Sequence, residues 1–246
     1  MSITVTIAEN AQELGKKSAA KIIQLLQEAI AKKDEARIIL STGASQFETM
    51  EALIHSDVDW SKVEMFHLDE YVGLPESHPA SFRKYLKERF VSKVNLKAAH
   101  FVDGEGDVEA NIAKVSAELK KKIVDVGVIG IGENGHIAFN DPPADFETTE
   151  AFKVVVLDDR CKQQQVGEGW FGGISDVPAT AITMTPHQIM ACEHIVSSVP
   201  HAVKAEAVYN TLTKAQDPMI PATLLKSHPD WNLFIDRQSA SKLIAW

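Results

Sequence analysis

The stretch RIILSTGASQFETMEAL, residues 37–53, decides the fold. Residues 37–40 form a short apolar segment that predicts a buried strand. Small turn residues follow at 41–45, and the apolar spacing after them predicts a helix that runs through Leu53. A strand, a short turn and a helix in succession make one βα unit, the building block of parallel sheets.

The same alternation continues along the chain. Strands are predicted at 1–7, 37–40, 63–68, 100–102, 124–130, 153–157, 180–183, 195–199 and 231–235, and helices at 11–31, 81–90, 108–122, 186–191, 203–213 and 221–227. This order favours an α/β fold, namely a doubly wound, mostly parallel sheet with helices on both faces, of Rossmann-like type. No linker, low-complexity tract or repeat interrupts residues 1–246, so we expect a single domain.

The composition narrows the class of protein. The chain has 246 residues, 45 % of them hydrophobic, and a formal net charge of -9, which excludes disordered and collagen-like proteins. The acidic excess argues against nucleic-acid partners, but a few local groups can still hold a small anion. No apolar run reaches membrane-spanning length, and Cys161 and Cys192 indicate neither a disulfide framework nor a zinc site. We therefore expect a cytoplasmic protein without a membrane or nucleic-acid partner.

The turns after strands are the candidate sites, because ligands of parallel sheets bind beyond the carboxyl ends of the strands. Ser41, Thr42, Gly43, Ala44 and Ser45 combine hydroxyl groups, a glycine and a helix start, which together suit a phosphate. The alternative is a simple turn in which Ser45 caps the helix.

Two further turns carry charged residues. Asp69 and Glu70 follow a strand directly, so either could be a general base, and the alternative is an ordinary acidic turn or cap. Lys204 lies in the first turn of the helix after strand 195–199, where its positive charge is unfavourable beside the positive end of the helix dipole. The negative charge of a bound phosphate would compensate, and the alternative is a solvated lysine.

The glycine-rich stretch 126–142 reads VGVIGIGENGHIAFNDP. A dinucleotide-binding glycine motif lies at the start of a helix in an early βαβ unit. These glycines do not, so we exclude a nicotinamide cofactor. Turns at Asn134-Gly135 and at Asp141 place His136 in a glycine-walled loop after a strand. A histidine there can relay protons while a carboxylate fixes its tautomer, and the alternative is a histidine satisfied inside the core.

In this order, the four turns resemble those of the glucosamine-6-phosphate deaminase (isomerase) family, and the resemblance covers nearly the whole chain. Residues 66–75, FHLDEYVGLP, and 130–142, GIGENGHIAFNDP, are similar to its two signature stretches. The sister family of 6-phosphogluconolactonases shares the fold and a glycine-histidine loop. That family continues into a Leu-Phe-Pro-like ending, so the ending at 139–142 is deaminase-like.

The resemblance implies an enzyme that converts an amino-sugar 6-phosphate to a ketose 6-phosphate and ammonia without a metal or organic cofactor. Glucosamine 6-phosphate is the expected substrate, with galactosamine 6-phosphate as a close analogue. Asp69 would be the general base, and His136, assisted by Asp141 and Asn134, would open the sugar ring. The phosphate would be held by 41–45 and by Lys204, while Glu70 and Gly135 are secondary site candidates.

Three departures from the family pattern accompany the resemblance. Aspartate stands at 141 where glutamate is common, so its contact with the histidine is expected to be adjusted or bridged by water. Asn134 stands where aspartate is common, which removes a charge that would raise the histidine pKa. No arginine occurs in 161–236, although the family places a phosphate-binding arginine near Gly169. Loss of that bidentate contact would weaken phosphate binding or indicate another substrate.

Two rival functions stay open from the sequence. The first is lactone hydrolysis of the 6-phosphogluconolactonase type. The second is a non-catalytic sugar-phosphate sensor, although such regulators usually carry an attached DNA-binding domain with a basic recognition helix. The sequence leaves the oligomeric state open, with a symmetric homo-oligomer as the common arrangement, and it shows no matching effector site, so we expect no allosteric control.

Overall fold

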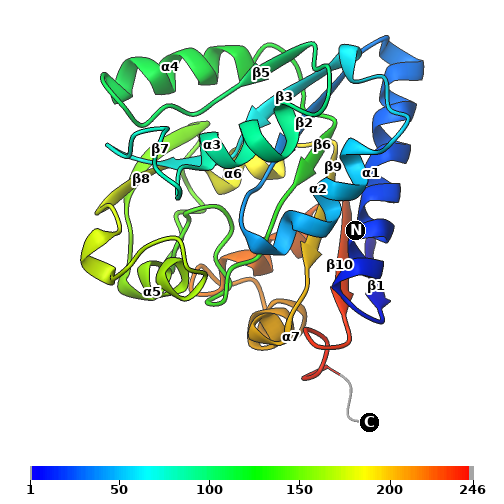
Figure 1. Cartoon of the computed structure of the whole chain (residues 1–246). Coiled ribbons are helices and arrows are strands. Elements are labelled where there is room, and N and C mark those ends of the chain that lie inside the picture. The colour runs from blue at the N-terminus through cyan, green and yellow to red at the C-terminus, as the bar shows by residue number, and fades with distance from the viewer. Residues whose placement is uncertain (1, 244–246) are drawn as a thin grey trace.

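A seven-stranded parallel sheet forms the centre of the computed structural model, which describes residues 2–243 (Figure 1). Every pairing in this sheet is parallel, as the sequence predicts. In spatial order its strands are β1 (Ser2–Ala8), β10 (Asp230–Asp236), β9 (His194–Val199), β6 (Val126–Val128), β2 (Ala36–Leu40), β3 (Val63–His67) and β5 (Ala98–His100). The predicted strand at 1–7 includes Met1, which lies outside the described residues.

Helices cover both faces of the sheet, and each face has its own apolar cluster. One face packs against α1 (Ala11–Lys33), α2 (Phe47–Ile54) and α3 (Phe82–Leu86), which continues into a π-helical turn at Lys87–Val91. The other face packs against α4 (Val108–Leu119), α6 (Pro186–Met190) and α7 (Ala205–Thr213). Short 3-10 turns occur at Ala44–Gln46, Trp60–Lys62, Ile174–Asp176, Ala202–Lys204 and Pro221–Ser227, the last of which was predicted as a helix.

A separate three-stranded antiparallel sheet corrects part of the prediction. It consists of β4 (Asp69–Tyr71), β8 (Thr180–Met184) and β7 (Phe152–Val156). The strands predicted at 153–157 and 180–183 therefore exist, but they do not join the parallel sheet. In β7 only Phe152 is buried, Lys153 and Val155 are half-buried, and Val154 and Val156 are exposed to solvent.

The polar helix α5 (Asp159–Gly167) is a further element that the sequence reading missed. Its residues DRCKQQQVG contain few apolar side chains, so no helical stripe is visible in the sequence. Only Cys161 and Gln165 of this helix are buried. Both turn toward the small sheet, where Cys161 packs in a third apolar cluster around Tyr71 and Phe139.

The strand order creates a topological switch between β2 and β6. From β2 the chain continues outward through β3 to β5, then returns to the other side of β2 as β6 and continues toward β9 and β10. The connections after β2 and β6 therefore diverge, which opens a crevice at their carboxyl ends. Within residues 2–243, no helix has the length and apolar character needed to cross a membrane.

Candidate active site

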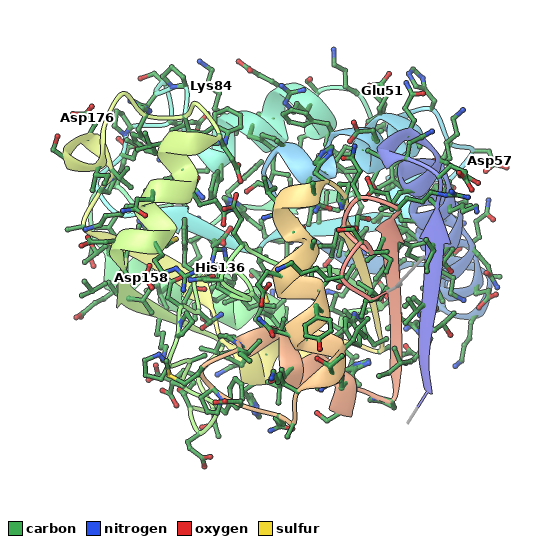
Figure 2. All side chains as sticks on the ribbon, turned by 90° about the horizontal axis from the view of Figure 1, so that it is seen from below. Glu51, Asp57, Lys84, His136, Asp158 and Asp176 are labelled. Carbon is green, nitrogen blue, oxygen red and sulfur yellow. The ribbon has the colours of Figure 1, made fainter. Side chains whose placement is uncertain are left out.

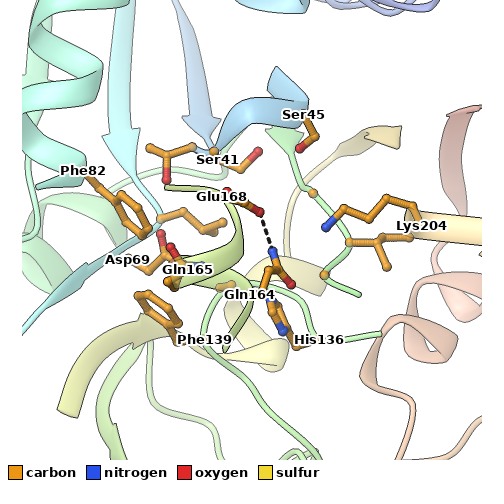
Figure 3. A pocket seen from close by; sticks show the side chains of 17 residues that line it. Ser41, Ser45, Asp69, Phe82, His136, Phe139, Gln164, Gln165, Glu168 and Lys204 are labelled. Atoms are coloured by element: carbon orange, nitrogen blue, oxygen red, sulfur yellow. Dashed lines mark hydrogen bonds between the residues drawn. The ribbon is translucent and has the colours of Figure 1, made fainter. Parts of the chain in front are cut away.

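A cleft lies at this switch point, where the ligands of such sheets bind (Figure 3). Its walls come from the ends of β2, β3, β6 and β9 and from α5. The residues that line it are Ser41, Thr42, Gly43, Ser45, Leu68, Asp69, Phe82, Gly130, Ile131, Gly132, His136, Ala138, Phe139, Gln164, Gln165, Glu168 and Lys204.

The structure brings most of the predicted site residues to this cleft. The predicted residues that line it are Ser41, Thr42, Gly43, Ser45, Asp69, His136 and Lys204. Ala44, Asn134, Gly135 and Asp141 adjoin lining residues without facing the cleft, and Glu70 does not reach it. In Figure 2, His136 lies in the interior of the molecule, while Glu51, Asp57 and Asp176 lie at its rim.

Asp69 begins β4 and presents its carboxylate to the cleft. Its backbone pairs with Thr183 of β8, and only 6 % of the residue is exposed. Burial, together with the neighbouring charge of Glu70, raises the pKa of Asp69 well above its usual value of 3.8. The carboxylate has no hydrogen-bond partner among residues 2–243, so its oxygens remain available to a ligand in the cleft. A raised pKa makes the ionised carboxylate a stronger base.

Glu70 faces the opposite side of β4, which overturns its place as a candidate base. Its carboxylate accepts hydrogen bonds from Ser81 Oγ at 2.9 Å, from the Arg83 N–H at 2.8 Å and from Arg83 Nε at 3.3 Å. The side chain is fully buried in this network. Because successive residues of a strand point to opposite faces, only one of two neighbouring carboxylates can enter the cleft.

His136 packs flat against the backbone of Gly132. A Cβ atom at Gly132 would lie 2.2 Å from both Nε2 and Cε1 of the imidazole, so only glycine leaves room for the ring. The backbone N–H of His136 donates to Asn134 Oδ1 at 3.1 Å, and His136 Nδ1 lies 3.3 Å from Asp141 Oδ1. The turn that presents the ring is thus fixed by groups on both sides.

Asp141 Oδ1 lies 3.3 Å from His136 Nδ1, but no hydrogen bond joins them, and Nδ1 has no hydrogen-bond partner among the described residues. The expected water bridge therefore stays a prediction. Burial would raise the pKa of Asp141, but the interactions with His136 and with Asn134 Nδ2, 3.4 Å away, lower it overall. An ionised partner at Nδ1 favours the tautomer that carries its proton there and leaves Nε2 free to act on a ligand. Asn134 thus contacts Asp141 through its amide, although it has no charge.

Cys161 of α5 adjoins this pair. The ligand atoms of His136, Asp141 and Cys161 lie within 4.8 Å of one another, a set of donor types that could hold a divalent cation such as zinc. Burial and the neighbouring carboxylates of Asp141 and Asp158 raise the pKa of the Cys161 thiol. In the protein alone, the thiol is therefore a neutral neighbour of Asp141.

The opposite end of the cleft has the features of an anion site. Ser41 is 4 % exposed, and its Oγ has no hydrogen-bond partner among the described residues although it faces the cleft. Lys204 is 5 % exposed and directs its ammonium into the same space (Figure 3). Burial lowers the pKa of Lys204, with partial compensation from Glu168 and Glu133. No hydrogen bond or ion pair of Lys204 Nζ occurs within residues 2–243, so a bound anion would complete the charge balance.

Two contributions to this end were not predicted. Gln164, Gln165 and Glu168 enter the cleft from α5 and its C-terminal cap, and the only sequence signal was their place just before Gly169. The Tyr85 hydroxyl donates to the Gly43 carbonyl at 2.9 Å, which fixes the 41–45 turn from the outside. Gly43 has φ +99°, a backbone conformation that favours glycine.

Comparisons with known proteins match most of this chain to one family. A family model described as glucosamine-6-phosphate isomerases/6-phosphogluconolactonase matches residues 9–233. A glucosamine-6-phosphate deaminase of Listeria monocytogenes serotype 4a is 33% identical over 91% of this chain and 94% of its own. The structure described as a monomeric glucosamine-6-phosphate deaminase has a TM-score of 0.89 and 28% identity, covering 97% of this chain and 99% of that one. The 6-phosphogluconolactonase of Trypanosoma brucei, at TM-score 0.80 and 16% identity over 99% of both chains, shares the fold.

Proposed function

The chain belongs to the glucosamine-6-phosphate isomerase/6-phosphogluconolactonase family, and from this we propose that it converts an amino-sugar 6-phosphate and water to a ketose 6-phosphate and ammonia. Glucosamine 6-phosphate is the first candidate substrate, because a relative that is 33% identical over 91% of the chain carries that name. The observation that carries the proposal is the placement of Asp69, His136 and Lys204 around one cleft.

The first step is opening of the sugar ring, and we assign it to His136. The neutral imidazole accepts the proton of the C1 hydroxyl and returns a proton to the ring oxygen as the C1–O5 bond breaks, which leaves an aldehyde at C1. Asp141 at 3.3 Å stabilises the imidazolium that forms between these two transfers. The cleft position of His136 beside the backbone of Gly132 holds the ring for this exchange.

The second step is proton transfer between C2 and C1, and we assign it to Asp69. Its carboxylate removes the C2 proton while the C1 oxygen gains a proton, which gives an enolamine. Return of the proton to C1 then leaves an imine at C2. Because Asp69 has no partner among residues 2–243 and a raised pKa, it is suited to both halves of this transfer.

Hydration completes the reaction. Water adds to the C2 imine, and the resulting carbinolamine expels ammonia to leave the ketone, so one water is consumed for each ammonia released. Lys204 and the 41–45 turn hold the phosphate at the other end, which keeps the sugar in register through all steps.

The test is a panel of aldose and amino-sugar 6-phosphates assayed for both ammonia and ketose. We expect glucosamine 6-phosphate to give both products in equal amounts. Turnover of 6-phosphogluconolactone without ammonia release from any amino sugar would assign the chain to lactone hydrolysis instead. Binding of sugar phosphates without any turnover would favour a sensor.

A substitution tests the assignment of His136. If the imidazole exchanges protons in the reaction, His136→Asn is expected to lower kcat by about 10²–10⁴-fold. An unchanged kcat in the variant would assign the proton exchange to another group. The matched control is His55→Asn, because His55 is an exposed histidine of the α2 end, outside the residues that line the cleft.

We propose a cytoplasmic setting, supported by two buried cysteines that form no disulfide. The predicted single domain and the expected homo-oligomer stay predictions, and light scattering on the purified protein would decide between the oligomer and a monomer such as the solved relative. We also propose hyperbolic kinetics that an N-acetylated amino-sugar phosphate does not change. Sigmoidal kinetics relieved by that compound would contradict this.

A further inference from the structure

A carboxylate stands inside the end of the cleft that suits an anion. Glu168 caps the C-terminus of α5 and lines the cleft together with Ser41 and Lys204 (Figure 3). One of its oxygens accepts a hydrogen bond from Gln164 Nε2 at 2.8 Å, and the other accepts one from Trp170 Nε1 at 3.1 Å. These two donors fix the carboxylate in place, so its position in the cleft is built into the fold.

Glu168 lies directly beside the 41–45 turn. A Cβ atom built on Gly43 would be 3.8 Å from Glu168 Oε2, with no other atom nearer to it outside the chain neighbours. Ser41, Thr42, Ser45 and Glu168 all line the same cleft, so an anion held by the three hydroxyl groups would also face the carboxylate. The sequence places a glutamate here, next to the position where an arginine was expected.

Glu168 does not neutralise Lys204. No ion pair within 4.0 Å joins the two side chains in the described part of the chain, although the charge of Glu168 raises the pKa of Lys204 against the larger effect of burial. The other titratable groups that face Glu168 are the hydroxyls of Tyr71 and Tyr85, and burial raises the pKa of both. Asp69 and His136 share the cleft. The anion site thus contains one fixed cation and one fixed carboxylate.

A carboxylate in an anion site has a specific chemical consequence. It repels a fully deprotonated oxyanion, but its remaining lone pairs can accept a hydrogen bond from an oxyanion that still carries a proton. A phosphate monoester has a second pKa of about 6, so both of its forms exist near neutrality. A sulfate ester has no proton to donate in this range, although its shape is nearly the same.

We propose that Glu168 makes this site selective for the protonated form of a phosphate, accepting the P–OH hydrogen while Lys204 and the 41–45 turn bind the other oxygens. The inference rests on the proposed function for its substrate, an amino-sugar 6-phosphate, and adds which ionic form is bound. No proton is transferred in this contact. The specificity-determining residue is Glu168, which distinguishes the phosphate monoanion from the dianion and from sulfate.

The first experiment compares KM values for glucosamine 6-phosphate between the wild type and Glu168→Gln across pH 6 to 8.5. Above the second phosphate pKa, the monoanion fraction falls about tenfold per pH unit. The ratio of wild-type to variant KM is expected to rise with that slope, because the other groups of the cleft are the same in both proteins. A ratio that does not change with pH would overturn the proposal.

The second experiment uses glucosamine 6-sulfate. The wild type is expected to discriminate against it, and Glu168→Gln is expected to lower its KM by about tenfold or more, since a charge-assisted contact is gained or lost. Glu133→Gln is the matched control, because Glu133 also acts on the charge of Lys204 but does not line the cleft. An equal effect of both substitutions would show that general charge, and not the contact with Glu168, governs the discrimination.

A third measurement separates this inference from the proposed function. Calorimetric titration with inorganic phosphate and with sulfate needs no turnover. The wild type is expected to bind phosphate at least about tenfold more tightly than sulfate, and Glu168→Gln is expected to lose that difference mainly by gaining sulfate affinity. Equal affinities in the wild type, or no binding of either anion, would overturn the inference. Failure of ammonia release with this discrimination intact would overturn the proposed reaction alone.

Discussion

The two sides of β4 place neighbouring carboxylates in opposite situations. Asp69 faces the cleft and has no hydrogen-bond partner among the described residues. Glu70 faces away and receives hydrogen bonds from Ser81, from Arg83 and from the N–H groups of Tyr71 and Phe82. Both are buried and acidic, so burial alone does not separate a reactive carboxylate from a structural one. The two carboxylates differ instead in the number of hydrogen bonds that they already accept from the protein.

The electrostatics follow from this difference. Burial raises the pKa of Glu70, but the backbone and side-chain donors around it limit the rise. Burial raises the pKa of Asp69 further, and the charge of Glu70 adds to the effect because nothing on the cleft side offsets it. The ionised form of Asp69 is therefore unfavourable in this fold, and the carboxylate gains stability when it takes up a proton from the substrate.

The largest expected effect is loss of activity on the cleft side. Asp69→Asn removes the base, so we expect kcat to fall by about 10²–10⁴-fold while sugar-phosphate binding persists. Steady-state ammonia release and calorimetric binding measure the two effects. The matched control is Asp57→Asn, an exposed aspartate far from His136 in Figure 2. Unchanged turnover in Asp69→Asn would remove Asp69 from the reaction.

The second effect is a loss of stability on the other side of the strand. Glu70→Gln replaces one accepting carboxylate oxygen with an NH2 group that faces other donors, and it leaves the buried Arg83 with one carboxylate fewer. We therefore expect the free energy of unfolding to fall by about 3 kcal/mol. Denaturant melts measure it. The control is Glu105→Gln, which removes an exposed carboxylate from the same Arg83 guanidinium, and we expect little change. A drop in kcat without a drop in stability would indicate that Glu70 acts in the reaction.

The third effect tests the cleft side without touching either carboxylate. Gly132→Ala would place a Cβ atom 2.2 Å from the His136 ring, so the imidazole must move and kcat is expected to fall by about 10²-fold. Gly167→Ala is the control, since a Cβ atom there has no neighbour within 4 Å. If the two variants have equal kcat, the ring position does not matter for the reaction.

The smallest effect is a pH dependence of stability. The folded-state pKa of Asp69 lies above 3.8, so its contribution to stability is fully present below the unfolded-state pKa and is lost as pH rises through the folded-state pKa. The free energy of unfolding of the wild type, relative to Asp69→Asn, should therefore fall as pH increases from 4 toward neutrality. Urea melts at several pH values measure this difference. The opposite slope would mean that a partner stabilises the ionised carboxylate.

Much of the fold could be predicted from the sequence because each βα unit carries local signals. The apolar run before Ser41 and the helical spacing after it specify β2 and α2, and the predicted strands at 63–68, 195–199 and 231–235 likewise overlap β3, β9 and β10. The cleft then follows from topology, since the carboxyl ends of parallel strands meet at one edge of the sheet. This geometry brought Asp69, His136 and Lys204 together although they are far apart in sequence.

Other features depend on long-range packing that no local pattern encodes. The direction of Glu70 is set by the pairing of β4 with β8, more than a hundred residues away. The helix α5 is polar, so its place over the cleft was invisible, and with it the role of Glu168 in the site. The predicted strand at 100–102 lies two residues earlier as β5, because its pairing with Glu64–Phe66 of β3 fixes the register.

The pairing of β1 with β10 has a consequence for synthesis of the protein. These strands hold the first and the last parts of the described sheet, and β1 has β10 as its strand neighbour. Residues 230–236 must therefore be synthesised before β1 can pair with β10. Until then, Ile3, Val5 and Ile7 lie on an unpaired strand whose apolar side chains remain partly exposed even in the finished fold. Between the synthesis of β1 and that of β10, the nascent chain thus carries a segment prone to association.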